Sequence, residues 1–216
     1  MTDDDLRLRY VEGINPSRWL DVWDARHPER SIEHERVGQP RQLRAVLAGE
    51  SDLAIVRAAE ADERLHRIVM FTESTAAIAE HDHPIGAFAE LTMADLENET
   101  LLDVTGLSHK DAAITAKTGA GIALMPMSVA RLYGGKGSTV RVVTDAPGHP
   151  VELVWLRERD DDDTQDFAGI VRGRKATSSR AAQPEEEKPK PKPKPKPAHR
   201  IPPRARPRRM QKRRGR

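Results

Sequence analysis

Histidine and aspartate side chains near the middle of the chain could bind a metal ion. His81 and His83 flank Asp82, and in an extended segment residues i and i+2 point to the same face, so two imidazole groups would lie together. His109 and His149 could supply further nitrogen donors. However, no third ligand stands at a spacing that is typical of zinc sites. We therefore predict no metal site.

Two glycine-rich segments could bind phosphate groups. In Gly119-Ala120-Gly121 a predicted helix precedes the glycines, whereas a dinucleotide site needs strand, glycines and then helix, so we interpret Gly119 as the end of that helix. In residues 134–139, Gly137 separates Lys136 from the hydroxyl residues, and the segment precedes a strand instead of following one. We interpret it as a turn, and we predict no cofactor.

Aspartates and other reactive side chains show no catalytic arrangement. The acidic run at residues 160–163 is typical of a helix start, where carboxylates are favourable without Mg²⁺. There is no Ser-His-Asp order, no paired carboxylate and no activated nucleophile. We predict no catalytic residue and no enzymatic activity.

Positive charge is concentrated at the C-terminal end of the chain. Residues 188–216 hold fourteen Lys and Arg residues and no acidic residue; since the whole chain carries +2, residues 1–187 carry −12. A cationic segment of this kind binds nucleic acid by releasing counterions, with steep salt dependence and little sequence preference. The predicted nucleic-acid contacts are Lys188, Lys190, Lys192, Lys194, Lys196, Arg200, Arg204, Arg206, Arg208, Arg209, Lys212, Arg213 and Arg214.

Alternatives for this segment stay open, namely contact with another polyanion, contact with the acidic body, or a role in solubility. Arg204-Ala205-Arg206-Pro207 resembles the Arg-Gly-Arg-Pro core of an AT-hook, but Ala205 replaces the glycine that lies flat in a minor groove. Alternating Lys and Pro in residues 188–197 favour an extended chain. We predict a disordered tail over residues 188–216, joined to the body by a linker of residues 175–187.

Composition excludes several classes of protein. The chain has no Cys, which excludes a disulfide framework and a Cys-based zinc site. Residues 1–5 are acidic where a signal peptide is basic, and the apolar runs are too short to span a membrane. We expect a cytoplasmic protein that does not insert into membranes.

Apolar residues recur at two spacings that predict an α/β fold. Strands at residues 6–11, 32–37 and 53–56 are separated by helices at residues 16–27 and 43–47. This order predicts mainly parallel sheets flanked by helices, and Trp19 and Trp23 form the core stripe of the first helix. Further strands are predicted at residues 65–71, 75–79, 101–102, 121–125, 140–143 and 151–155, and further helices at residues 92–97, 110–117, 126–132 and 160–174.

The segments in this order resemble the effector-binding domain of LysR-type transcriptional regulators, which has a two-lobed fold like the type II periplasmic-binding proteins. The matching segments are residues 6–28, residues 49–56 (Gly-Glu-Ser-Asp-Leu-Ala-Ile-Val), residues 83–86 (His-Pro-Ile-Gly), residues 91–96 (Leu-Thr-Met-Ala-Asp-Leu) and residues 118–126. The resemblance implies one domain over residues 6–174. Its first lobe would contain residues 6–74 and 139–174, and its second lobe residues 75–137.

Two departures from the family pattern bear on function. A LysR-type regulator begins with a winged helix-turn-helix, whereas here the first strand of the effector domain begins at Leu6, so we expect no DNA-binding domain of that kind. Only residues 103–109 separate the strand at 101–102 from the next helix, where the family inserts a further strand and loop. We therefore expect a trimmed second lobe.

The resemblance implies an effector site between the lobes, at helix N-termini whose backbone N–H groups favour a carboxylate. Arg57 could pair bidentately with that carboxylate, while Ser17, Gln39 and Ser128 offer neutral hydrogen-bonding groups. The alternative is that these residues are only helix caps and turns. The predicted effector-binding residues are Asn15, Ser17, Gly38, Gln39, Arg57, Thr72, Ser74 and Ser128.

Together these features predict a LysR-like protein that binds a small-molecule effector, with a carboxylate as the favoured class, and that contacts nucleic acid through its tail. Its partners would be a second copy of the chain or LysR-type regulators. One alternative is a dimerisation or accessory module that no longer binds a ligand. Another is a nucleic-acid-associated protein with a passive body.

Overall fold

The computed structural model describes residues 5–174, which lie in one compact unit, Met1–Ser178. The linker and tail predicted at residues 175–216 lie outside the described residues. The elements in chain order are β1 (Leu6–Val11), α1 (Ser17–Arg26), β2 (Ile32–Val37), η1 (Gln39–Arg41), α2 (Arg44–Leu47), β3 (Leu53–Arg57), β4 (Leu65–Glu73), β5 (Thr75–Glu80), η2 (Pro84–Ala87), η3 (Ala94–Leu96), α3 (His109–Lys117), β6 (Ala123–Pro126), α4 (Met127–Tyr133), β7 (Ser138–Val143), β8 (His149–Leu156), η4 (Arg157–Arg159) and α5 (Asp162–Val171).

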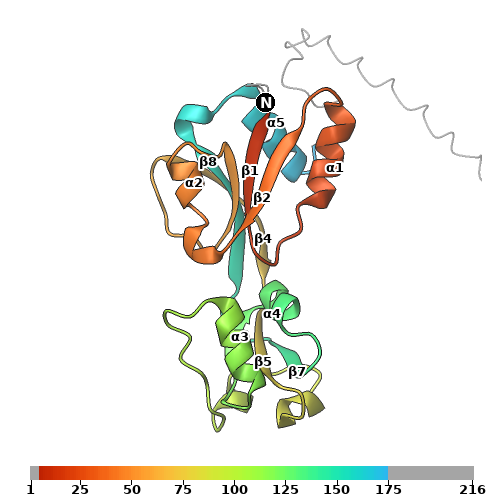
Figure 1. The fold of residues 1–216 in the computed structure, drawn as a ribbon, viewed down its shortest axis with the longest axis vertical. Coiled ribbons are helices and arrows are strands. Elements are labelled where there is room, and N and C mark those ends of the chain that lie inside the picture. The colour runs from red at the N-terminus through yellow and green to blue at the C-terminus, as the bar shows by residue number, and fades with distance from the viewer. Residues whose placement is uncertain (1–4, 175–216) are drawn as a thin grey trace, which may run out of the picture. The chain divides into compact units, whose positions relative to one another are not determined.

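A five-stranded sheet in the order β2-β1-β3-β8-β4 forms the first half of the fold (Figure 1). Strand β1 pairs in parallel with both β2 and β3, as the β-α-β-α-β order predicts, whereas β8 runs antiparallel between β3 and β4. The five residues of β3 are all buried, because this central strand has helices on both faces. We call this sheet with α1, α2 and α5 lobe 1.

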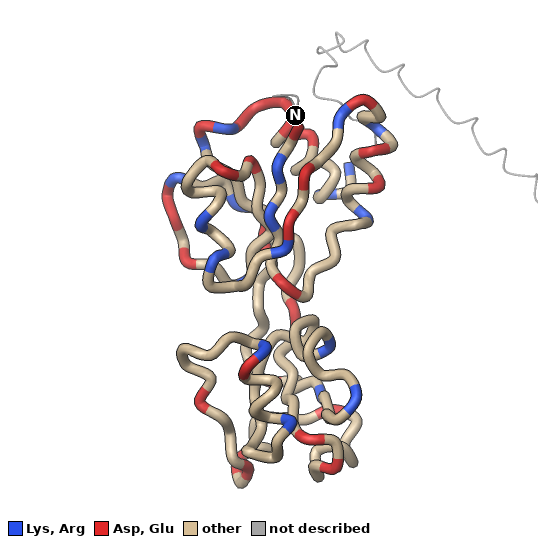
Figure 2. Tube along the Cα trace, in the orientation of Figure 1, with Lys and Arg blue, Asp and Glu red and all other residues tan. Residues whose placement is uncertain are grey.

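Aromatic residues build the core on one face of this sheet. Trp19 and Trp23 of α1 are buried, as their spacing predicts, and the ring of Trp23 lies 6.1 Å from that of Phe167 of α5. Both helices therefore pack over one face of the sheet. Val46 of α2 covers the opposite face, against buried residues of β3 and β8. Figure 2 shows Lys, Arg, Asp and Glu distributed over the elements of this lobe.

A three-stranded sheet in the order β6-β5-β7 forms the second half. Both of its ladders are antiparallel, so the expectation of mainly parallel sheets is wrong for this sheet. The reason is that β5 enters directly from β4 and both of its neighbours return toward lobe 1 beside it. Helices α3 and α4 pack on one face through small residues, including Ala112 and Ala116, while η2 and η3 cover the other face. We call this sheet with α3 and α4 lobe 2.

Two strand connections join the lobes: β4 leads into β5 at Ser74, and β7 leads into β8 through residues 144–148. The sequence-based boundary placed residues 139–143 in lobe 1, but β7 pairs with β5 over its whole length. The correct return point is therefore after Val143. A single-sequence pattern shows that a segment is a strand without showing which sheet it joins.

Local capping predictions agree with the structure. Thr92 and Asp95 exchange the hydrogen bonds of a capping box at a short 3-10 helix, and Asp161 caps α5 by accepting a hydrogen bond from the N–H of Thr164. Gly119 has φ +80° just after α3 and ends that helix, which confirms the interpretation of the glycine motif. Residues 101–102 form only an isolated bridge, from Leu101 to Ile122, instead of a strand. None of the helices in residues 5–174 is long and apolar enough to cross a membrane.

Candidate functional site

The carboxyl ends of the parallel strands β1 and β3 point toward lobe 2, and the candidate site lies at this edge. In open α/β sheets ligands bind beyond the carboxyl ends of the strands. Arg57 is the last residue of β3, Glu12 follows β1, and Ser128 lies in the first turn of α4. These three residues bring the two lobes into contact.

The guanidinium group of Arg57 is the centre of the site. Its Nε donates to Oε2 of Glu73 at 2.6 Å and its Nη1 to Oε1 of Gln39 at 3.3 Å. Its Nη2 donates to the carbonyl oxygen of Glu12 and to Oγ of Ser128, both at 2.9 Å. The side chain is 0% exposed. Arg57 therefore already holds a carboxylate, that of Glu73, and links both lobes.

The backbone of Arg57 is anchored as firmly as its side chain. Its N–H donates to Oε1 of Gln42 at 2.7 Å, and its carbonyl oxygen accepts from Nε2 of the same amide at 2.9 Å. Both residues are buried. This pairing holds the end of β3 against the helical segment after β2, so the guanidinium group keeps one position.

The predicted effector-binding residues fall into three groups. Gln39, Arg57 and Ser128 are brought together by direct hydrogen bonds. Asn15 and Ser17 are exposed and bond to each other, with the Ser17 hydroxyl donating to Oδ1 of Asn15 at 2.7 Å.

The remaining three residues are not joined to Arg57 by a hydrogen bond in the described part of the chain. Gly38 is the residue before η1, and Thr72 is exposed near the end of β4. Ser74 accepts a backbone hydrogen bond from Met127 at 3.0 Å. These residues lie at the edge of the site.

Glu12, His109 and Tyr133 form a second cluster at the same junction, which sequence reasoning did not identify as a site. Oε1 of Glu12 lies 2.8 Å from Nδ1 of His109, and the hydroxyl of Tyr133 donates to Oε2 at 2.5 Å. Burial, then the hydrogen bond to Glu12 and its negative charge, raise the pKa of Tyr133 to about 12. The sequence signal was weak, since only the position of Glu12 after a strand pointed to this edge.

His149 closes the site on the side of β8. Because the Thr75 hydroxyl donates to the carbonyl oxygen of Pro147 at 2.6 Å, it accepts the hydrogen of Nε2 of His149, 2.9 Å away. Burial and the positive charge of Arg57 lower the pKa of His149, against the opposing effect of Glu73. His149 is therefore favoured in its neutral form.

Two of the histidines considered as metal ligands, His81 and His83, lie between β5 and η2. His81 is exposed, and Nδ1 of His83 accepts from the backbone N–H of Ile85 at 3.4 Å. Within residues 5–174 no group of three or more His, Asp or Glu side chains is placed to hold a metal ion.

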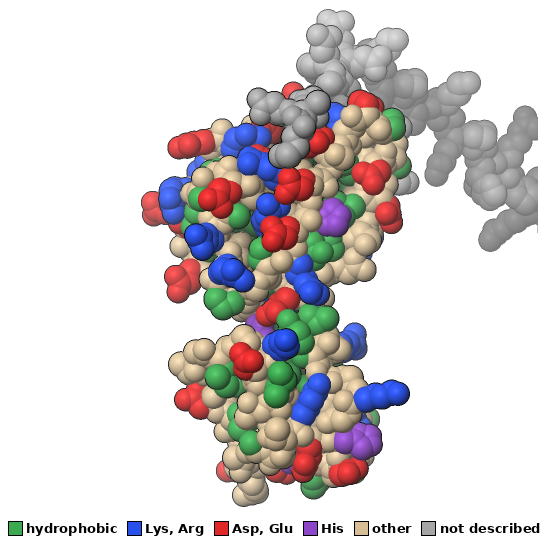
Figure 3. Space-filling view, in the orientation of Figure 1, with side chains coloured by type: hydrophobic (Ala, Val, Ile, Leu, Met, Phe, Trp, Pro, Cys, Tyr) green, Lys and Arg blue, Asp and Glu red, His purple; other side chains and the backbone are tan. Residues whose placement is uncertain are grey.

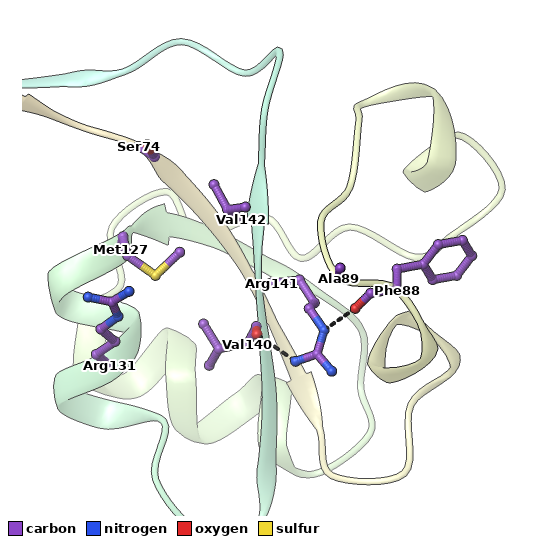
Figure 4. A pocket seen from close by; sticks show the side chains of 8 residues that line it. All are labelled: Ser74, Phe88, Ala89, Met127, Arg131, Val140, Arg141 and Val142. Carbon is purple, nitrogen blue, oxygen red and sulfur yellow. Dashed lines mark hydrogen bonds between the residues drawn. The ribbon is translucent and has the colours of Figure 1, made fainter.

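An open pocket of about 530 Å³ lies beside β7 on lobe 2 (Figure 4). Its walls are mainly apolar, and Arg131 of α4 extends over one side. The guanidinium group of Arg141 turns to the backbone, where it donates to the carbonyl oxygens of Phe88 and Gly86. The pocket is lined by Ser74, Phe88, Ala89, Met127, Arg131, Val140, Arg141 and Val142. Figure 3 shows side chains of both charges and apolar side chains mixed on the visible face, without one large apolar area.

Comparison with known proteins matches residues 17–116 to the family described as LysR substrate binding domain. No curated protein sequence matches the chain. The BenM effector binding domain with its effector benzoate has a TM-score of 0.63 at 15% identity, over 80% of this chain and 92% of that chain.

Two further solved structures are similar at the level of the fold. The reduced OxyR regulatory domain from Pseudomonas aeruginosa has a TM-score of 0.60 at 17% identity, over 78% and 94% of the two chains. Full-length CbnR complexed with target DNA has a TM-score of 0.61 at 15% identity, over 78% of this chain and 70% of that chain. At these identities the similarity shows a shared fold.

Proposed function

We propose that this chain, whose residues 17–116 match the family described as LysR substrate binding domain, is a small-molecule effector-binding module connected to transcription regulation. Its effector would lie between the lobes, at the carboxyl ends of β1 and β3. The module would act in the cytoplasm by binding, without catalysing a reaction. The proposal rests on the site described above and on the fold shared with effector-binding domains.

A single observation carries the choice of effector class: the donors at the junction are arranged around carboxylates. Nε of Arg57 donates to the carboxylate of Glu73, and His109 and Tyr133 hold the two oxygens of Glu12. N–H and O–H donors that face a carboxylate from several elements suit a carboxylate effector. Benzoate, the effector named in the BenM structure, belongs to the same chemical class.

The test is thermal denaturation of the full chain with a panel of carboxylates, including acetate, benzoate and amino acids, each beside the corresponding neutral amide. A specific effector at 100 times its Kd should stabilise the protein by about 2.7 kcal/mol. Ser128→Ala should weaken binding by about 1 kcal/mol, because one hydrogen bond at the junction is lost. Ser138→Ala, on β7, is the matched control and should bind as the unchanged protein does.

The saturated bonding of Arg57 supports a second candidate function. Its Nε and both terminal nitrogens already have partners in the described part of the chain, which favours an accessory or dimerisation module that no longer binds a ligand. If no carboxylate raises the melting temperature above the effect of its amide, this candidate replaces the first.

The proposal includes nucleic-acid binding by the tail. Residues 188–216 carry fourteen positive charges and no negative charge, enough to bind a polyanion without base readout. The tail would then hold the effector-binding module on nucleic acid, beside a second copy of the chain or intact LysR-type regulators.

A further inference from the structure

The carboxylate of Glu12 occupies a site between the lobes that is formed by two hydrogen-bond donors, which we call the cradle. Glu12 follows β1 in lobe 1, and its side chain is 12% exposed. Its carboxylate contacts Nδ1 of His109, the first residue of α3, and the hydroxyl of Tyr133, the last residue of α4. Each donor thus comes from a different helix of lobe 2, and each meets a different oxygen.

Among the described residues, His109 and Tyr133 form side-chain hydrogen bonds only with Glu12. The structure gives the imidazole of His109 and the hydroxyl of Tyr133 no other hydrogen bond within residues 5–174. Because a carboxylate only accepts hydrogen bonds, Nδ1 of His109 carries a hydrogen. Without Glu12, two donors from two helices would face the junction together, in the arrangement that suits one carboxylate.

The side chain of Glu12 can leave this cradle without disturbing β1. Its backbone N–H donates to the carbonyl oxygen of Val37 at 3.0 Å, and its own carbonyl oxygen accepts from Nη2 of Arg57 at 2.9 Å. Both bonds use backbone atoms of Glu12 and are independent of its side-chain torsions. Release of the carboxylate therefore breaks its hydrogen bonds with His109 and Tyr133 and leaves these two backbone bonds in place.

We infer that His109 and Tyr133 form a carboxylate-binding site that Glu12 occupies as an internal ligand, and that an effector carboxylate competes with Glu12 for it. The inference rests on the proposed function and adds two residues that hold the effector and one that opposes it. Glu12 joins lobe 1 to lobe 2 through its side chain, so displacing it removes one connection between the lobes. The Arg57 connection remains.

Rescue of a Glu12→Ala variant by added carboxylate tests this site. The variant should melt at a lower temperature, and acetate or propionate should restore part of the loss, because the freed donors accept an external carboxylate. Acetamide and propionamide at the same concentrations should have no such effect. Glu33→Ala is the matched control, since the exposed Glu33 of β2 forms an ion pair with Arg9 of β1, and acetate should not rescue it.

The ionisation of Tyr133 supplies a readout at the site itself. In a background where Tyr10, the only other tyrosine, is changed to Phe, the absorbance titration reports Tyr133 alone. Its pKa of about 12 should fall in Glu12→Ala and rise again when acetate is added. If Glu12→Ala does not fold, Glu12→Gln keeps the volume of the side chain and allows the same titration.

Three outcomes would overturn the inference. In a folded Glu12 variant, acetate could raise neither the melting temperature nor the pKa of Tyr133. It could stabilise Glu12→Ala and Glu33→Ala equally, which is a general salt effect. Amides could rescue as well as carboxylates. Failure of the effector proposal is separate, because it is measured as the response of the unchanged protein to the carboxylate panel.

Discussion

Arg57 and Glu73 form a buried ion pair at the point where the chain leaves lobe 1. Nε of Arg57 lies 2.6 Å from Oε2 of Glu73, and the two side chains are 0% and 9% exposed. Glu73 ends β4, and β5 of lobe 2 begins two residues later. The pair therefore fixes the first connection between the lobes to the end of the central strand β3.

Removing one member of this pair should destabilise the whole domain. Glu73→Ala leaves the Arg57 charge buried without its carboxylate, and we expect a loss of about 3–5 kcal/mol in the free energy of unfolding. Denaturation with urea measures it. Glu35→Ala breaks the exposed ion pair with Arg9 and should cost less than about 1 kcal/mol. Equal losses in the two variants would show that the buried ion pair contributes no more to the free energy of unfolding than the exposed pair.

Gly13 should tolerate no side chain, because lobe 2 lies directly against it. A Cβ at this position would lie 2.5 Å from Oγ of Ser128 and 3.1 Å from the backbone of α4, at φ +84°. Left-handed strain costs an alanine about 1–2 kcal/mol, and overpacking adds about 1–3 kcal/mol. Thermal and urea denaturation of Gly13→Ala measure the sum.

Gly49→Ala separates the two causes, since Gly49 has φ +71° and no atom within 4 Å of its added Cβ. This control should lose only the part due to backbone strain. Ser128→Ala in the Gly13→Ala protein should recover part of the difference, because it removes the closest clashing atom. A Gly13→Ala protein as stable as Gly49→Ala would mean that the lobes are not in close contact at this point.

His149 should make the folded protein less stable in mild acid. Its pKa lies below the ordinary value of 6.5 because of burial and the charge of Arg57, so the unfolded chain binds this proton more readily than the folded chain. The stabilisation is complete above pH 6.5 and is lost as the pH falls below that value toward the pKa of the folded state. His149→Gln should reduce this loss in melting curves between about pH 7.5 and pH 5. His81→Gln, at an exposed position, should leave this loss of stability unchanged.

Asp52 should be the carboxylate whose loss most weakens the start of β3. Burial would raise its pKa, but hydrogen bonds from Arg7 and the charges of Arg159 and Arg7 outweigh burial and lower it. Its stabilisation is therefore complete above its ordinary pKa of 3.8 and is lost as the pH falls toward the pKa of the folded state. Asp52→Asn should cost about 1–3 kcal/mol at neutral pH in urea denaturation. The exposed Asp21→Asn should be neutral, and a similar loss in both would contradict this account.

Removal of residues 188–216 should abolish nucleic-acid binding without changing the melting temperature of the body. These residues hold fourteen positive charges, and Ile201 and Met210 are nearly their only large apolar side chains. Affinity of the full chain for duplex DNA should fall steeply between about 50 and 200 mM salt and vary little between sequences. Electrophoretic mobility shifts of the full and shortened chains measure it. Sequence-selective binding by the shortened chain would overturn the tail as the contact.

Local patterns predicted most elements because their causes are local. Alternating residues in β1, the tryptophans of α1 and the capping box at Thr92 depend on neighbours within a few positions in the chain. The sheet that β7 joins could not be predicted in the same way. Strand β7 pairs with β5, some sixty residues earlier, and many strand pairings are compatible with the same alternation.

The site shows the same division between local and long-range causes. The sequence alone determined that Arg57, Gln39 and Ser128 stand at element ends, and it determined the charge of the tail, because both follow from order and composition. Only the tertiary structure decided that Arg57 is already paired with Glu73, and that Glu12 meets His109 across a separation of 97 residues. Hydrogen-bond partners of this kind are chosen by the packing of two lobes. Packing depends on distances in space, and these distances cannot be obtained from the spacing of residues along the chain.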